Sequence, residues 1–255
     1  MRPELEIACD ESGAEGENLI GGVTDVFAHA GVVLDLDVAE SCVLEVRDRI
    51  RSPASEYKAV HLLRGKHRAV LEWLLSSGGP LYGNATVFLA EKTYYFIVKL
   101  MGDQARTVYD EGPGILGEER WNSFLRSYNE LMRGTRLVPE LDPLLPAIVR
   151  LVERWSEGGH AVSIVHDRQT ALNEERIAWL KEIYADSGKL AGLRLVAARS
   201  DARVQIADFL AGVARKIASD ELNGRGDDVL TGLLRPYVDP ASIWGDLRSW
   251  GLLGR

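Results

Sequence analysis

Asp208 is the only charged residue in an apolar stretch, Val204 to Ala214, whose spacing is that of a helix. Val204 lies one turn before it and Ala211 one turn after, so we expect the carboxylate to point toward the protein core. Burying an isolated ionised carboxylate is costly, so such a residue is usually paired, protonated or bound to a metal ion. The alternative to a metal is an ion pair with Arg203 or Arg215.

Three further acids stand where they could join Asp208. Asp10 and Asp167 each end a predicted strand, and Glu56 lies in a short polar connection, two residues before Lys58. If the two strands are neighbours, their carboxylates come together, and like charges that close repel unless a cation separates them. Four carboxylates around two cations suit two-metal hydrolysis of a phosphodiester, and hard oxygen ligands favour Mg²⁺ or Mn²⁺.

Each of these residues also has a simpler interpretation. Asp10 could cap the turn that follows its strand, and Asp167 could cap the next helix. Glu56 alone is more often a solvated charge. Lys58 either neutralises the scissile phosphate or is an ordinary surface lysine.

The remaining candidates are weaker. Asp201 is expected to be the N-cap of the helix that contains Asp208. His166 should face away from Asp167 because neighbouring strand residues alternate, so it is not a candidate base. No serine or cysteine triad pattern is present. The candidate substrate-binding residues are Ser12, Arg64, Lys66 and Gln205, although a charged helix face would also explain Arg64 and Lys66.

The elements that must position these side chains alternate between strands and helices, which indicates an α/β protein. The first two predicted strands should pair antiparallel because no crossover helix separates them, and the apolar run that ends at Asp167 is typical of a buried parallel strand. Predicted strands cover residues 5–10, 26–34, 84–90, 161–167 and 193–198; predicted helices cover 37–50, 64–77, 93–110, 117–133, 142–156, 171–186 and about 202–223.

We interpret residues 1–255 as a single domain, with a helical insertion at about 93–157 and a C-terminal helical tail at about 227–255. Within the insertion, Gly112-Pro113-Gly114 and Leu137-Val138-Pro139 are expected to separate the helices.

Composition limits the class of protein that this sequence can encode. A chain of 255 residues with 46% hydrophobic and 27% charged residues is typical of an ordinary globular protein. The net charge of −8 argues against binding nucleic acid through a broad basic surface, but not against a nuclease with a local cleft. Cys9 and Cys42 have no zinc spacing, and no signal peptide or membrane span is expected, so we expect a cytoplasmic protein.

The motifs together resemble the domain of unknown function 3800 family, which is placed among the ribonuclease H-like folds. The similarity rests on Asp10-Glu11-Ser12-Gly13, Glu56-Tyr57-Lys58, Asp167 at a strand end, and Ser200-Asp201 leading into Gln205-Ile206-Ala207-Asp208. It implies a ribonuclease H-like mixed sheet flanked by helices and a metal-dependent nuclease centre. The metal ligands it implies are Asp10, Glu56, Asp167 and Asp208. Two departures are the helical insertion, which matches no motif, and the compact spacing from Ser200 to Gln205.

The sequence therefore favours a metal-dependent nuclease acting on RNA or DNA. Its expected catalytic residues are Asp10, Glu56, Lys58, Asp167 and Asp208. Two alternatives stay open: a catalytically inactive ribonuclease H-like binding module, and a phosphoesterase that uses the same metal site on a small molecule.

Overall fold

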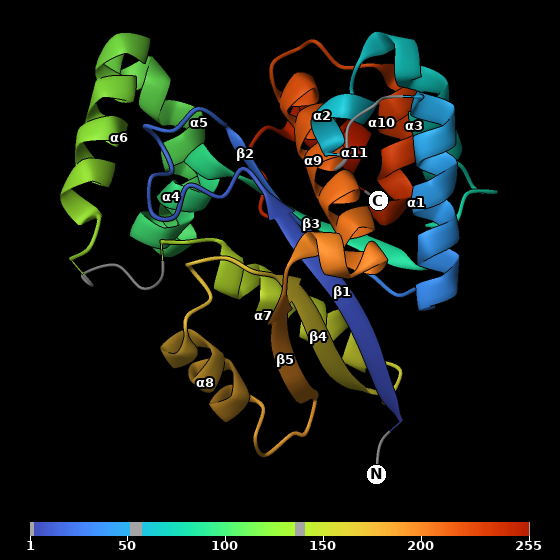
Figure 1. The fold of residues 1–255 in the computed structure, drawn as a ribbon. Helices are drawn as coiled ribbons and strands as arrows, with labels where there is room; N and C mark the ends of the chain where they lie inside the picture. Colours follow the sequence, from blue (N-terminus) through green and yellow to red (C-terminus); the bar gives the residue numbers. More distant parts are fainter. Residues whose placement is uncertain (1–2, 52–57, 136–140, 255) are drawn as a thin grey trace.

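A five-stranded mixed sheet forms the centre of the computed structural model, which describes residues 3–51, 58–135 and 141–254 (Figure 1). The strand order is β3-β2-β1-β4-β5. The strands are β1 (Glu4–Ser12), β2 (Val26–Val32), β3 (Ala85–Glu91), β4 (Ala161–Asp167) and β5 (Leu190–Val196).

The pairing changes from antiparallel to parallel at β1, and β2 is the described strand that runs opposite to the others. β1 pairs antiparallel with β2, and β2 pairs antiparallel with β3, whereas β1–β4 and β4–β5 are parallel. The predicted α/β class, the antiparallel first hairpin and the parallel strand ending at Asp167 are confirmed. β1 continues two residues beyond Asp10, and β5 lies about three residues earlier than predicted, because alternation marks the centre of a strand better than its ends.

Helices cover both faces of this sheet. On one face, α9 (Ala202–Leu222) packs on β1 and β2 with α1 (Leu36–Ile50) and α3 (Arg68–Leu75). On the other face, α7 (Leu144–Ser156) and α4 (Lys92–Met101) pack on the opposite side of the strands. The smaller elements are α2 (Ala59–Leu62), η1 (Gly65–His67), η2 (Gly102–Gln104), α5 (Ala105–Leu116), α6 (Glu118–Met132), α8 (Glu174–Ile183), η3 (Ala198–Ser200), α10 (Asp228–Leu234), η4 (Arg235–Tyr237) and α11 (Leu247–Leu253).

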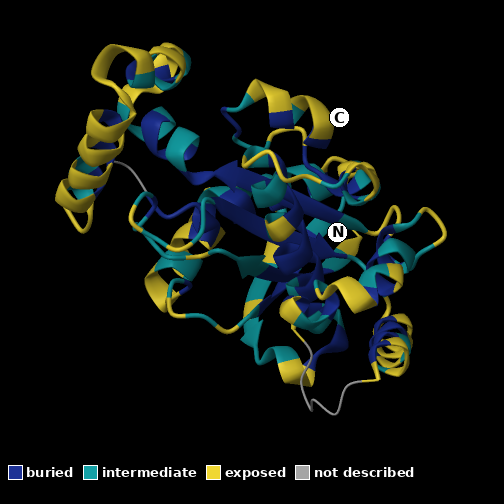
Figure 2. Ribbon diagram, turned by 90° about the horizontal axis from the view of Figure 1, so that it is seen from above, coloured by how far each residue is buried: buried dark blue, intermediate teal, exposed yellow. Residues whose placement is uncertain are grey.

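Buried residues follow the same layering. Figure 2 shows the buried class concentrated in the central strands, whereas β5 is of intermediate or exposed class and most of the projecting α5–α6 pair is exposed. None of the helices in the described ranges combines the length and the hydropathy needed to cross a membrane.

The predicted helix break at Gly112-Pro113-Gly114 is wrong. α5 runs through Pro113, and the chain instead turns at Gly102 and Gly117, which have φ values of 52° and 78°. Gly112 serves packing, because a Cβ there would lie 2.6 Å from the ring of Trp121 on α6. The second predicted break, Leu137-Val138-Pro139, lies outside the described residues.

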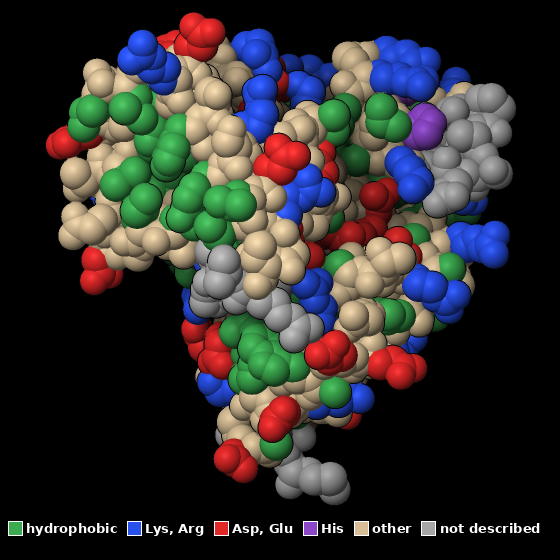
Figure 3. All heavy atoms as spheres, turned by 90° about the vertical axis from the view of Figure 1, so that its left-hand side faces the viewer, with side chains coloured by type: hydrophobic (Ala, Val, Ile, Leu, Met, Phe, Trp, Pro, Cys, Tyr) green, Lys and Arg blue, Asp and Glu red, His purple; other side chains and the backbone are tan. Residues whose placement is uncertain are grey.

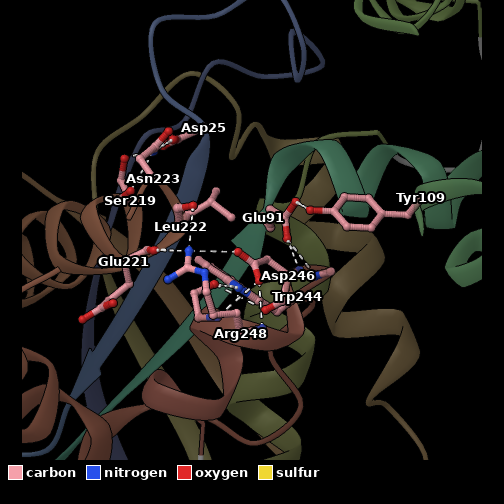
Figure 4. A network of polar contacts seen from close by, with 12 residues as sticks. Asp25, Glu91, Tyr109, Ser219, Glu221, Leu222, Asn223, Trp244, Asp246 and Arg248 are labelled. Atoms are coloured by element: carbon pink, nitrogen blue, oxygen red, sulfur yellow. Dashed lines mark hydrogen bonds and ion pairs between the residues drawn. The ribbon is translucent and has the colours of Figure 1, made fainter. Parts of the chain in front are cut away.

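The segment after α10 covers the outer edge of β3. The amides of Asp239 and Ile243 donate to the carbonyls of Val87 and Leu89 over 2.8 and 2.9 Å. Nearby, the buried Glu91 carboxylate accepts from the Tyr109 hydroxyl at 2.5 Å and from the Gly245 amide at 2.7 Å (Figure 4). These bonds join the sheet to both the helical insertion and the C-terminal tail.

Candidate functional site

Asp10 and Asp167 lie at the same end of two adjacent parallel strands. Cys9 is in register with His166, so the next position along each strand carries a carboxylate. Asp10 is buried and Asp167 is half-buried. The condition under which the two carboxylates come together, that their strands are neighbours, is therefore met.

Helix α9 brings Asp208 over this pair. Its first turn packs Val204 on Ala8 of β1 and Val165 of β4. One turn further along the helix is Asp208, and two residues further along the strands are Asp10 and Asp167. The three carboxylates therefore lie just beyond a cluster of three apolar residues, Ala8, Val165 and Val204.

Asp208 itself is half-buried: its charge acts on buried Asp10, but the side chain is not fully enclosed in the core as its apolar neighbours in the sequence indicated. Those neighbours are buried where α9 packs on β1, β2 and α1. Of the two arginines suggested as its partners, Arg203 binds Asp201 and Glu6, and the Nε of Arg215 donates to Ser12 Oγ at 3.0 Å.

The crowding of carboxylates is visible in the pKa of Asp10. Burial raises the pKa of Asp10 to about 9, with further contributions from the charges of Glu11, Asp208 and Asp167. A 2.8 Å hydrogen bond from the Glu11 amide to Asp10 Oδ1 opposes this shift. Such a group stays protonated at neutral pH unless positive charge is brought to it.

Glu11 belongs to this cluster although the sequence analysis did not select it. Burial and then the charge of Asp167 raise the pKa of Glu11 to about 7. Its Oε2 atom is buried without a hydrogen-bond partner and lies 3.7 Å from Nε2 of His166. The sequence analysis ended the strand at Asp10, whereas β1 continues past it and pairs Glu11 with His29 of β2.

A buried pair of histidines, His29 and His166, lies beside Glu11. Nε2 of His29 and Nε2 of His166 are 3.2 Å apart, and Nδ1 of His166 lies 2.9 Å from the Asp167 carbonyl oxygen. A carbonyl only accepts, so His166 carries its proton on Nδ1, and burial lowers its pKa to about 4, which keeps it neutral. His29 therefore donates from Nε2, and its buried Nδ1 is an acceptor without a partner among the described residues. His166 faces away from the Asp10 side, as predicted.

The expected helix-capping roles of Asp167 and Asp201 have different outcomes. Asp167 does not cap the next helix, because α8 is capped by Asn173; Asp167 Oδ1 instead accepts from the Ala198 amide at 2.8 Å. Asp201 is the N-cap of α9 and accepts from the Arg203 amide, as predicted.

Lys58 stands at the start of α2 and is exposed. The next residue, Ala59, packs so tightly on Gly212 of α9 that a Cβ at position 212 would lie 2.2 Å from the Ala59 Cβ. Gly212 follows Asp208 by one turn, so this contact holds the Lys58 end of α2 beside the carboxylate helix. Glu56 lies outside the described residues.

The candidate substrate-binding residues are spread around this centre. Gln205 is half-buried on α9, three residues before Asp208. Arg64 and Lys66 are exposed beside η1, and after burial their charges are the next causes that lower the pKa of His67. Ser12 contacts α9 through Arg215. Figure 3 shows acidic side chains at the bottom of a hollow on one face, with Lys and Arg side chains around it.

The side chains are not gathered into a ready metal site. Within residues 3–51, 58–135 and 141–254, no group of three or more His, Cys, Asp or Glu side chains is arranged to hold a metal ion. The chemistry of the donors nevertheless suits a hard divalent cation, because all are carboxylate oxygens and one of them, Glu11 Oε2, has no hydrogen-bond partner.

Comparison with known proteins assigns no family to this chain. No protein-family model matches the chain, and no similar sequence was found among curated proteins.

Proposed function

We propose that the protein is a metal-dependent phosphodiesterase that acts as a nuclease. The observation that carries the proposal is the convergence of Asp10, Asp167 and Asp208 from β1, β4 and α9 at one end of the sheet. Burial first, and then the charges of neighbouring acids, raise the pKa of Asp10, and a divalent cation would relieve this repulsion.

The fold supports the same assignment. A mixed sheet with helices on both faces is the architecture that the resemblance to the domain of unknown function 3800 family implies. On this basis Asp10, Asp167, Asp208 and, from the resemblance alone, Glu56 would hold Mg²⁺ or Mn²⁺. Because the described side chains do not converge at ligand distance, the proposal includes their rotation when a cation binds.

A bound divalent cation would lower the pKa of an attacking water and stabilise the leaving oxygen. The chain supplies the remaining functions. Lys58 would offset the charge that develops on the phosphate, and the contact of Ala59 with Gly212 holds Lys58 close to α9. Glu11 Oε2 can hold a proton beside the cluster, because its pKa is raised to about 7.

An open hollow suits a polymer better than a small phosphorylated metabolite, which is usually enclosed by its binding pocket. A second candidate function is a non-catalytic nucleic-acid binding module. The observation that favours it is that no ready metal-binding group exists among the described residues.

Divalent-metal titration and cleavage assays separate these functions. Calorimetry with Mn²⁺ should show binding by the wild type that Asp10→Asn and Asp208→Asn each abolish, and cleavage of RNA, DNA or hybrid oligonucleotides should be lost with it. Asp48→Asn, an exposed acid on α1, is the matched control and should behave as wild type. Metal-independent retention of oligonucleotide binding with no cleavage by wild type would favour the binding module.

A further inference from the structure

A second polar pocket lies beside the carboxylate centre, between the loop that joins β1 to β2 and the C-terminal half of α9. Its volume is about 350 Å³. The polar residues that line it include Asp25, Thr93, Arg215, Ser219, Asn223 and Arg225.

Arg215 connects this pocket to the centre. Asp208, Gly212 and Arg215 follow one another at helical spacing along one stripe of α9, and seven residues span about 10 Å of helix. Ser12, two residues after Asp10, accepts from Arg215 Nε at 3.0 Å. A Cβ on the neighbouring Gly13 would lie 2.8 Å from Arg215 Cδ, so the arginine stem is packed against the strand end.

The Arg215 guanidinium is therefore held in place, but not all of its N–H groups donate hydrogen bonds to described residues. Among the described residues, the bond from Nε to Ser12 is the one hydrogen bond recorded for Arg215, which leaves its terminal nitrogens available to a ligand in the pocket that it lines. A planar guanidinium with two free donor groups matches a phosphate in particular.

The N-terminus of α4 also borders the pocket. Thr93, at the second position of this ten-residue helix, lines the pocket; the N-cap acid Glu91 is bonded to the amides of Gly245 and Asp246, and the Lys92 amide donates to the Asp25 carbonyl. Backbone amides at a helix N-terminus favour an anion.

The acid in the pocket is already satisfied. Asp25 accepts from Ser219 Oγ of α9 at 2.6 Å and from Nδ2 of Asn223, the residue that follows α9, at 2.5 Å, as Figure 4 shows. Against this one carboxylate, the described lining holds two arginines, but Arg225 is exposed and lies 3.8 Å from Asp220, so Arg215 supplies the pocket's positive charge. Buried Lys92 does not add a free charge, because it is paired with Glu15 at 2.8 Å.

We propose that this pocket is a phosphate subsite, which holds a neighbouring phosphate of the nucleic-acid strand whose scissile phosphate lies at the carboxylates. The inference rests on the proposed nuclease function for its substrate. Arg215 is the positioning residue, because it contacts both the pocket and the strand end that follows Asp10. Arg215 orients the nucleic-acid strand along α9 and takes no part in bond cleavage.

The experiment measures binding without cleavage. A fluorescent single-stranded oligonucleotide is titrated in EDTA at several salt concentrations with the full-length wild type, Arg215→Gln and Lys216→Gln. Lys216 is exposed on the same helix and paired with Asp220, so its variant loses the same charge outside the pocket. We expect Arg215→Gln to lower the slope of log K against log salt by about 0.7, the value for one phosphate on a single strand. Lys216→Gln should leave the slope unchanged.

Equal slopes for Arg215→Gln and wild type would overturn the subsite, as would equal losses in both variants. Binding of inorganic phosphate that depends on Arg215, without an effect on the oligonucleotide, would also overturn it, because the source would then be a small phosphate compound. Thermal unfolding of each variant checks that the fold is retained.

The two proposals fail separately. If wild type binds the oligonucleotide through Arg215 but never cleaves it with Mn²⁺, the nuclease function fails and the subsite stands. If cleavage depends on Asp10 while the salt slope ignores Arg215, the subsite fails and the nuclease function stands.

Discussion

Gly212 of α9 and Ala59 of α2 approach so closely that a methyl group at position 212 would lie 2.2 Å from the Ala59 Cβ. Gly212→Ala should therefore push α2 and Lys58 away from α9 and destabilise the protein by about 1–3 kcal/mol, the usual cost of overpacking. Urea denaturation measures the loss. Gly232→Ala in α10 is the control, because nothing lies within 4 Å of its Cβ, and helix propensity should make that variant slightly more stable. A stabilised Gly212→Ala variant would contradict the packing described.

Lys58 should affect cleavage but not metal binding. Lys58→Ala removes a charge that would stabilise the transition state, so we expect about a hundredfold loss in kcat with unchanged Mn²⁺ affinity. Asp10→Asn should lose both. Stopped-time cleavage assays and calorimetry on the same preparations test this split, and a Lys58→Ala enzyme with normal kcat would refute the role.

The stability of the metal-free protein should fall as pH rises. The pKa of Asp10 in the folded protein is raised from 3.8 to about 9, so its contribution to stability is full below pH 3.8 and is lost as pH rises toward about 9. Urea unfolding in EDTA at pH 6 and pH 8.5 should show the decrease. Asp10→Asn should flatten this part of the profile and be more stable than wild type at pH 8.5. An unchanged slope in that variant would mean that Asp10 does not titrate in this range.

Glu91 of β3 should stabilise the packing of the C-terminal tail on the sheet. Glu91→Ala leaves the amides of Gly245 and Asp246 without their acceptor, so we expect a loss of about 2–4 kcal/mol, whereas Tyr109→Phe removes one hydrogen bond and should cost about 1 kcal/mol. Denaturation midpoints compare the two variants. Similar losses for both would show that the tail amides find other acceptors.

Strand direction could be predicted from the sequence because it depends on local patterns. The lack of a crossover helix before β2 indicated an antiparallel hairpin, and the apolar run of β4 indicated a parallel strand. That β4 lies beside β1, which brings Asp10 and Asp167 to one end of the sheet, was only a condition in the sequence analysis, because this pairing joins segments far apart in the chain. The N-cap at Asp201 was equally local, since it needs only an acid before a helical pattern.

What the sequence did not reveal depends on contacts between distant elements. Gly112 looked like a helix break because its packing partner, Trp121, belongs to another helix. Asp208 looked buried because its sequence neighbours are apolar, but exposure depends on where α9 passes the strand ends. Glu11 was missed because alternation places it on the face opposite Asp10, whereas at a strand end its long side chain still interacts with Asp10 and Asp167.

The chain segment that bonds to Val87 and Leu89 also limits self-association. An uncovered edge strand offers a template to which another molecule can add, and in this protein the β3 edge is occupied by the chain itself. Among the described strands, the other edge of the sheet is β5, so sheet extension by another molecule is opposed by coverage at the β3 edge.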